Sequence, residues 1–218
     1  MRWTTTGFAT ALLSALLGLA LVSSAQEKKD DGGAPPKAAP VGTIAGLVKG
    51  KWVAKFPAAV YLDEIPGKTF PPPAEHAKVN QENLVFSPRV LPILVGTTVD
   101  FRNSDPFLHN VFCPDQCAEF NLGTWGKGES KSYTFTKAGC VATLLCRVHP
   151  EMIAYIVVCS TPYFAATEKD GSFKIENVPP GKYKLVTWHE KLEAASADVV
   201  VEAGATARAE VEPTKKKK

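Results

Sequence analysis

Short β-rich segments separated by turn residues recur from about residue 40 onward, and they constrain the fold more than any other feature of the sequence. Val, Ile, Thr, Tyr and Phe dominate these segments and Gly, Pro, Asn or Asp bounds them, whereas apolar residues at helical spacing are scarce. The expected strands are 43–48, 58–62, 97–102, 132–136, 141–146, 153–159, 173–176, 183–188 and 198–202. Many short strands joined by turns are typical of sandwiches and barrels, so the sequence predicts an all-β fold.

The composition excludes several classes of protein. The chain has 218 residues, of which 45% are hydrophobic and 22% charged. These proportions are incompatible with collagen-like, fully disordered and multi-span membrane proteins. The formal net charge is only +3, and four of the lysines form the run 215–218. A nucleic-acid-binding face needs a much denser positive charge, so we expect no nucleic-acid partner.

The N-terminus has the three parts of an export signal. Met1 and Arg2 precede an apolar run over residues 7–22, and small residues follow at 23–25. The run is shorter than the roughly 20 residues that a helix needs to cross a bilayer, which favours a cleaved signal peptide over a membrane anchor. We therefore predict a signal peptide at 1–25, a flexible leader at 26–40, no membrane span after cleavage, and a periplasmic or secreted protein in which disulfides can form.

A cysteine, a histidine and a methionine lie together between two expected strands. They are Cys146, His149 and Met152, which place a thiolate, an imidazole and a thioether in one short loop. Soft sulfur combined with imidazole favours copper, and two imidazoles, a thiolate and a distant thioether are the ligands of blue-copper sites. The second imidazole is available from His109, in the segment that follows strand 97–102. The sequence therefore predicts a site for one copper ion.

Three other interpretations of this loop are open. A structural zinc site would need four nitrogen or sulfur ligands and no thioether. Met152 as an ordinary core residue would leave a three-ligand site. Cys146 and His149 could act as nucleophile and base, but no third residue that would orient them is evident.

Residues 82–159 resemble the cupredoxins in the order, spacing and strand context of these side chains. The resemblance implies a Greek-key β-sandwich with one type 1 copper ion. It carries the ligand roles over to His109, Cys146, His149 and Met152. It also makes Asn110 a candidate for supporting the ligands, although Arg147 stands where many cupredoxins have Ser or Thr, so that only Asn110 is carried over.

The same resemblance implies one-electron transfer rather than an enzymatic reaction. The electron would leave at the edge of His149, inside an apolar rim of Pro150, Phe107 and Leu108, toward a transient partner such as a cytochrome or an oxidoreductase. Two alternatives are a periplasmic protein that stores, delivers or senses copper, and a cell-envelope binding module with the cupredoxin as an insertion. The candidate binding patch for the last alternative is Trp188, His189 and Glu190.

Two separated segments resemble a second domain family. Residues 42–63 are similar to the opening strands of the carboxypeptidase regulatory-like, transthyretin-type sandwich, and 170–185 to its closing strands. The domain expected from this resemblance is discontinuous, over 41–79 and 161–212, with the cupredoxin domain at 80–160 and a basic tail at 213–218. The alternative is that 42–63 forms the first hairpin of the middle domain.

The other four cysteines are expected to form two bridges in an exported chain. If Cys146 and Ile153 oppose each other across the loop, then Cys140 and Cys159 also oppose each other, which predicts a Cys140–Cys159 disulfide. Cys113 and Cys117 then remain as a second pair. A second metal site or a redox-active dithiol is the alternative for these two.

Overall fold

The computed structural model describes residues 40–216, which form sixteen strands and no helix. The predicted all-β class is therefore confirmed. The predicted signal peptide lies outside the described residues, as does nearly all of the predicted leader. None of the described residues forms a helix that could cross a membrane. All of them belong to one compact unit.

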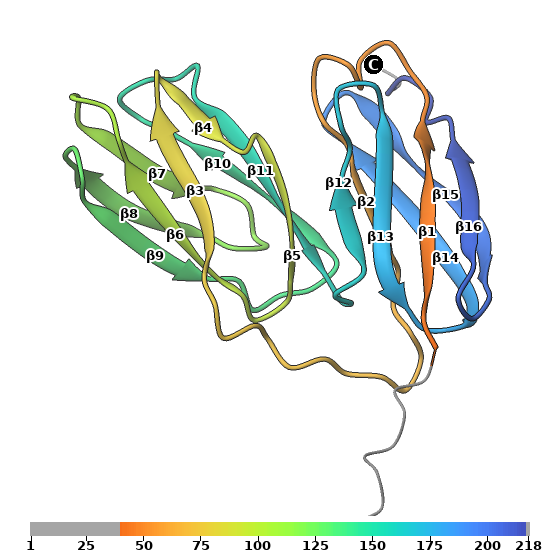
Figure 1. The fold of residues 1–218 in the computed structure, drawn as a ribbon. Helices are drawn as coiled ribbons and strands as arrows, with labels where there is room; N and C mark the ends of the chain where they lie inside the picture. The colour runs from red at the N-terminus through yellow and green to blue at the C-terminus, as the bar shows by residue number, and fades with distance from the viewer. Residues whose placement is uncertain (1–39, 217–218) are drawn as a thin grey trace, which may run out of the picture. The chain divides into compact units, whose positions relative to one another are not determined.

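The middle of the chain folds into a sandwich of two sheets around one apolar core (Figure 1). In spatial order, one sheet holds β5 (Val90–Leu94), β11 (Ile153–Cys159), β10 (Cys140–Leu145), β7 (His109–Cys113) and β8 (Phe120–Trp125). The other sheet holds β4 (Val85–Ser87), β3 (Ala77–Glu82), β6 (Thr98–Asn103) and β9 (Ser130–Thr134). We call this the first sandwich.

The ends of the described chain build a second sandwich. One of its sheets holds β13 (Ser172–Val178), β1 (Gly42–Val48) and β16 (Thr206–Val211). The other holds β12 (Phe164–Ala166), β2 (Ala59–Leu62), β14 (Gly181–His189) and β15 (Leu192–Val201). β1 and β2 lie in different sheets, and neither pairs with a strand of the first sandwich. The Pro-rich segment 63–76 connects β2 to β3.

Strand β11 is buried on both faces, which explains why its sequence is an uninterrupted apolar run. Alternate residues Ala154, Ile156 and Val158 belong to the core of the first sandwich. The intervening Val157 and Cys159 belong to a separate buried cluster that also contains Ala59 of β2 and Val90 of β5. This cluster, together with partly buried neighbours that include Trp188, provides apolar contact between the strands of the two sandwiches.

Both predicted disulfides are wrong, and the Cys140–Cys159 pairing fails because the register of β10 and β11 differs by one residue from the one expected. Leu145 opposes Ile153, so Cys140 opposes Val158 and not Cys159. A shift of one residue turns a side chain to the other face of a strand. Cys159 accordingly points into the cluster with Val90, and Cys140 packs against the core of the first sandwich.

The structure instead joins Cys117 to Cys140, with 5.9 Å between their Cα atoms. Cys113, Cys146 and Cys159 are free thiols, all buried. Burial raises the pKa of Cys113 to about 11 and the pKa of Cys159 to about 12. Cys113 ends β7 with its side chain buried in the core, whereas Cys117 in the following loop is bonded to Cys140.

His189 and Glu190 are buried at the end of β14, so they do not form the exposed binding patch considered from the sequence. His189 donates from Nε2 to the carbonyl of Phe56 at 3.0 Å, and its Nδ1 accepts the backbone N–H of Lys191 at 3.0 Å. In the neutral imidazole, Nε2 therefore donates one hydrogen bond and Nδ1 accepts one. Burial is the main reason why the pKa of His189 is lowered, and the charge of Lys216 lowers it further. The hydrogen bond to the carbonyl of Phe56 and the carboxylate of Glu190 raise it, but by less.

The basic tail begins as ordered structure rather than as a free end. Lys215 forms an isolated bridge with Leu192, and the N–H of Glu193 donates to the carbonyl of Thr214 at 2.8 Å. Lys216 donates from its ammonium to the carbonyl of Glu190 at 3.4 Å. The segment before Lys217 is thereby attached to the β14–β15 hairpin.

Reduction of the protein should lower its free energy of unfolding by about 3 kcal/mol, because the Cys117–Cys140 bridge closes a loop of moderate length in the unfolded chain. Denaturant unfolding with and without reductant measures this difference. Cys117→Ala should unfold at the same denaturant concentration under both conditions. Peptide mapping that links Cys159 to Cys140 would contradict the observed pairing.

The free energy of unfolding should fall as the pH drops below about 6.5, the ordinary pKa of histidine. The unfolded chain binds a proton at His189 in that range, whereas the folded chain resists it because its pKa is lowered. His189→Gln should flatten the pH dependence between pH 6.5 and 5, as measured by denaturant unfolding. A pH dependence of His189→Gln as steep as that of the wild type would contradict this role of His189.

Candidate metal centre

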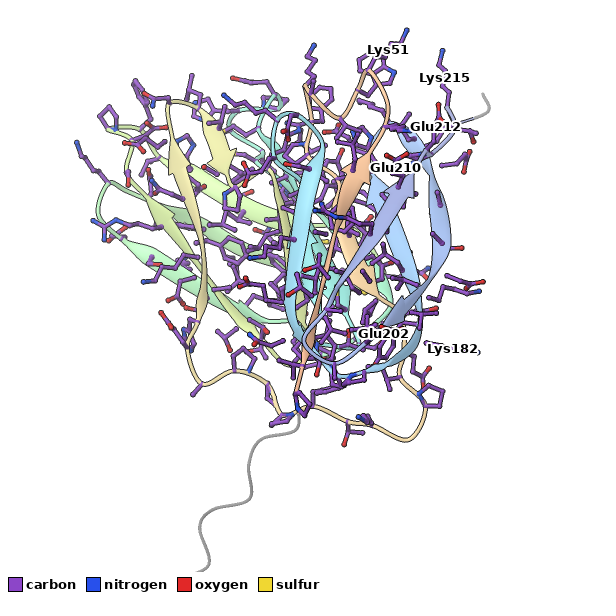
Figure 2. All side chains as sticks on the ribbon, turned by 45° about the vertical axis from the view of Figure 1, so that its right-hand side comes forward. Lys51, Lys182, Glu202, Glu210, Glu212 and Lys215 are labelled. Atoms are coloured by element: carbon purple, nitrogen blue, oxygen red, sulfur yellow. A yellow bond between two sulfur atoms is a disulfide. The ribbon has the colours of Figure 1, made fainter. Side chains whose placement is uncertain are left out.

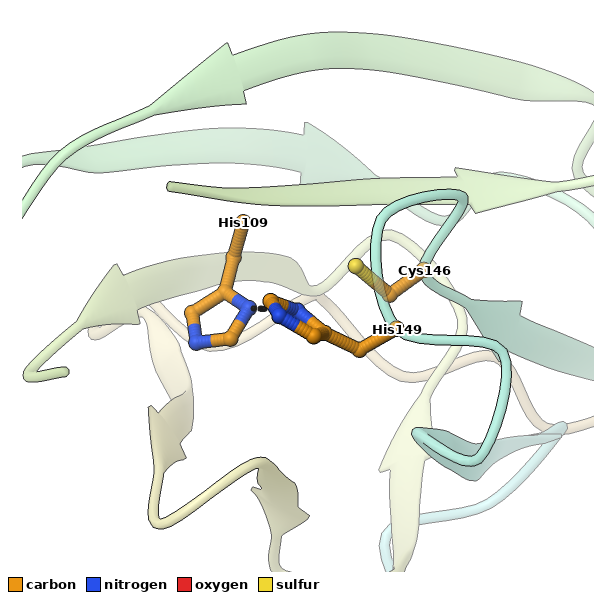
Figure 3. Close-up of side chains that lie close together, drawn as sticks. All are labelled: His109, Cys146 and His149. Carbon is orange, nitrogen blue, oxygen red and sulfur yellow. Dashed lines mark hydrogen bonds between the residues drawn. The ribbon is translucent and has the colours of Figure 1, made fainter. Parts of the chain in front are cut away.

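Three side chains that the sequence placed in two separate segments converge at one end of the first sandwich (Figure 3). His109 is the first residue of β7, Cys146 follows β10 directly, and His149 lies in the loop before β11. One ligand atom from each lies within 4.8 Å of the others. The Nδ1 atoms of the two histidines are 3.0 Å apart. His109 and Cys146 are buried and His149 is half-buried, so the group is covered except at one imidazole.

The short loop is shaped by the register of the two strands that it joins. Leu145 and Ile153 are the last paired residues, so 146–152 must reverse the chain within seven residues. The N–H of Met152 donates to the carbonyl of His149 at 3.0 Å, which closes a turn through Pro150. Cys146 and His149 therefore face the same space.

Asp105 determines which nitrogen of His109 is free. Its Oδ2 lies 2.8 Å from Nε2 of His109, and both side chains are buried. Because an ionised carboxylate can only accept, Nε2 carries the proton and Nδ1 presents a lone pair toward His149. The carboxylate stays ionised: burial would raise its pKa, but the N–H of Leu84, the ring of His109 and the N–H of Asn83 outweigh burial and lower it.

The carboxylate of Asp105 is itself held by a tight turn. Asn83 and Leu84 connect β3 to β4 with φ angles of 56° and 61°, as a type I′ turn requires. Leu rarely adopts such a backbone. The N–H of Asn83 donates to Oδ1 of Asp105 at 2.7 Å, and that of Leu84 to Oδ2 at 3.0 Å. The turn, the carboxylate and His109 therefore form one hydrogen-bonded chain.

Asn110 supports Cys146 through both its backbone and its side chain. Its N–H points at Sγ of Cys146 at 3.5 Å, and its Oδ1 accepts the N–H of Arg147 at 3.4 Å. Its Nδ2 donates to Asn121 Oδ1 at 2.9 Å and to the carbonyl of Gly123 at 2.8 Å, across a bulge in the β7–β8 pair. The backbone of Arg147 thus makes the contact with Asn110, whatever its side chain. That side chain lies with its guanidinium carbon 4.9 Å from the centre of the Phe112 ring.

Met152 is 1% exposed and belongs to the same buried cluster as Cys146. It ends the loop immediately before β11. The sequence-predicted residues His109, Cys146, His149 and Asn110 are thus brought together, with Met152 at the edge of the same loop. Asp105 was missed, although a carboxylate four residues before a candidate ligand is a signal that the sequence contains.

The donor set fits a soft or borderline transition metal. It offers two imidazoles and a buried sulfur whose neighbours are backbone N–H and apolar groups, and these suit copper or zinc better than magnesium or calcium. One nitrogen lone pair is already directed inward by Asp105. The arrangement can therefore bind a metal ion through groups that are held before the ion arrives.

Comparisons with known proteins match only parts of the chain. Residues 160–209, within the second sandwich, match the family model of polysaccharide lyase family 4, domain II. No curated protein matches the sequence.

Solved structures that resemble the chain include amicyanin variants and another cupredoxin. The reduced form of one amicyanin variant is 27% identical, over 39% of this chain and 84% of that one, with a TM-score of 0.37. A copper(I) form of another variant is 25% identical, over 44% and 96%, with a TM-score of 0.36. A purple cupredoxin from Nitrosopumilus maritimus is 26% identical, over 38% and 98%, with a TM-score of 0.34. Each similarity covers less than half of this chain.

Asp105→Asn should change the tautomer of His109. An amide can present an N–H to Nε2, and its single oxygen cannot serve the turn and the imidazole as the carboxylate does. Nitrogen NMR of the imidazoles in metal-free protein should show His109 protonated on Nε2 in the wild type and a large fraction protonated on Nδ1 in the variant. Asp100→Asn, at a carboxylate bound to Ser132 and His76, should leave the His109 signals unchanged.

Proposed function

We propose that this chain is an exported mononuclear type 1 copper protein that transfers single electrons. The observation that carries the proposal is the convergence of one ligand atom each from His109, Cys146 and His149 within 4.8 Å, with the two Nδ1 atoms 3.0 Å apart. Two imidazoles and one thiolate are the equatorial ligands of such sites, and a thioether is their weak axial ligand. Met152 is the candidate for the axial position because it ends the same loop and is buried.

Bound copper would supply a one-electron couple between Cu(I) and Cu(II). The residues of the chain would keep the donors in place during that change. Asp105 holds the imidazole of His109, and Asn110 holds Sγ of Cys146 and the backbone of Arg147. A site whose ligands are oriented by such contacts needs little rearrangement when its charge changes. This favours transfer of electrons over chemistry on a bound substrate, and we propose no enzymatic activity.

The electron would enter and leave through His149, the half-buried member of the group. Exposed apolar side chains lie in the neighbouring segments: Phe107 is 55%, Leu108 59% and Val148 46% exposed. The ring of Phe107 lies edge-on to that of His149, with 6.5 Å between their centres. A small apolar rim suits the weak interfaces of redox partners. The proposed partner is a cytochrome or an oxidoreductase that docks transiently.

The predicted export signal supports a periplasmic or secreted location, and the Cys117–Cys140 bridge is compatible with an oxidising compartment. We also propose that the second sandwich is a discontinuous domain of the transthyretin type, because β1 and β2 share its two sheets with β12 to β16.

Copper(II) added to the purified mature protein should produce an intense visible charge-transfer band and a mononuclear paramagnetic spectrum, because the Cys146 thiolate would bind the ion directly. Cys146→Ala should abolish the band. Cys159→Ala is the matched control, since it removes a buried free thiol that lies outside the group, and it should retain the band.

A colourless wild-type protein at saturating copper would refute the proposal. Voltammetry of the same sample distinguishes a carrier of electrons from a protein that stores copper. Reversible cycling without loss of copper is expected for the carrier, whereas release of copper on reduction would favour storage or delivery.

A further inference from the structure

Arg89, between β4 and β5, binds a carboxylate of the second sandwich and, at the same time, the first residue of β11, directly after the candidate metal-binding loop 146–152. Its Nε and Nη2 donate to the two oxygens of Glu190, at 2.6 and 3.0 Å. Its Nη1 donates to the carbonyl of Ile153 at 3.2 Å. Ile153 is the residue after Met152. One guanidinium therefore connects the end of β14 with the end of the loop.

The surroundings leave this guanidinium little freedom. Its central carbon lies 4.8 Å from the ring centre of Phe56 and 5.9 Å from that of Tyr155. The side chain of Glu190 is 1% exposed. Burial would raise the pKa of Glu190, but the hydrogen bonds and charges of Arg89 and Lys191 outweigh burial and lower it. The pair therefore stays ionised and bidentate, which fixes the plane of the guanidinium.

Met152 and Arg89 lie beside the same cleft, although the Met152 side chain is only 1% exposed. A cleft of about 290 Å³ is lined by Met152, Phe86, Arg89 and Glu151, among others. Side chains next to a void are held less firmly than those in a filled core. The bond from Arg89 to the carbonyl of Ile153 is a side-chain contact that holds the backbone beside Met152, in addition to the pairing of Ile153 with Leu145.

The two sandwiches do not need this ion pair to associate. An apolar cluster around Val90, Val157 and Ala59 already joins them. A buried ion pair typically adds little stability compared with apolar residues of the same size, and its best-attested benefit is a defined geometry. The three hydrogen bonds of Arg89 have fixed directions, so they can define the geometry of the contact between the two sandwiches.

We infer that the second sandwich positions the metal-binding loop: Glu190 orients Arg89, and Arg89 holds the Ile153 carbonyl so that Met152 keeps its buried position. Glu190 and Arg89 are positioning residues in this scheme. The consequence for copper rests on the proposed function, whereas the consequence for the order of the loop does not.

Hydrogen exchange of the metal-free protein tests the positioning directly. In Glu190→Gln the amide of Met152 should exchange at least about tenfold faster than in wild type, because the hydrogen bonds to a charged partner are weakened. Amides of β1 and β13 should exchange as in wild type. Glu176→Gln is the matched control, since it removes an exposed carboxylate of the same sandwich that is paired with Lys174, and it should change neither region.

A double variant, Arg89→Met with Glu190→Met, covers the case in which Glu190→Gln does not fold. Two apolar side chains can preserve the contact between the sandwiches while removing the bond to Ile153. Exchange at Met152 should again be faster. Exchange at Met152 as slow as in wild type, or a uniform increase across both sandwiches, would overturn the inference and leave the pair a purely structural contact.

A copper(II) titration of the same variants separates the two proposals. The paramagnetic spectrum of Glu190→Gln should differ from the spectrum shared by wild type and Glu176→Gln, because a weak axial ligand tunes such sites. An unchanged spectrum together with faster exchange would show that Met152 does not ligate, while the loop is still positioned. If neither the wild type nor any variant binds copper, the proposed function fails, and the exchange data alone decide whether Arg89 and Glu190 position the loop.

Discussion

The burial of β11 on both faces is the constraint on which the rest of the structure depends. One face completes the core of the first sandwich with Ala154 and Ile156, and the other meets residues of the second sandwich with Val157 and Cys159. A slip by one residue would exchange the side chains that pack against the two sandwiches, so the shapes of both contacts fix the register. Its pairing with β10 fixes where the loop 146–152 begins and ends. The position of the candidate ligands follows from this register.

The candidate metal-binding group of His109, Cys146 and His149 is organised by polar contacts outside it. Asp105 is ionised in a buried place because the Asn83–Leu84 turn supplies two N–H donors, and it then determines the proton position on His109. The turn adopts a backbone that Leu rarely takes. A strained turn of this kind is tolerated when surrounding contacts compensate for it. Here the carboxylate of Asp105 both stabilises the turn and orients His109.

The sequence predicted the fold class and the candidate ligands because both depend on local patterns. Alternating apolar residues between turns indicated strands, and the spacing of Cys146, His149 and Met152 placed three donor groups in one loop. The disulfides were predicted wrongly because they depend on register. The predicted register was wrong by one residue. In the structure Cys159 therefore lies on the opposite face from Cys140, and Cys140 is bonded to Cys117. Asp105 was missed because its role depends on the distant turn at Asn83.

The sequence by itself therefore determined that this chain is built from strands, and it placed the candidate donors Cys146, His149 and Met152 in one loop with His109 in a separate segment. Only the tertiary structure decided which cysteines pair, which nitrogen of His109 is free, and that Arg89 joins Glu190 to the loop. The physical reason is the distance along the sequence between the residues that determine each property. Side-chain chemistry and strand periodicity are properties of neighbouring residues, whereas bridges, tautomers and ion pairs depend on groups that meet only after the sheets have packed.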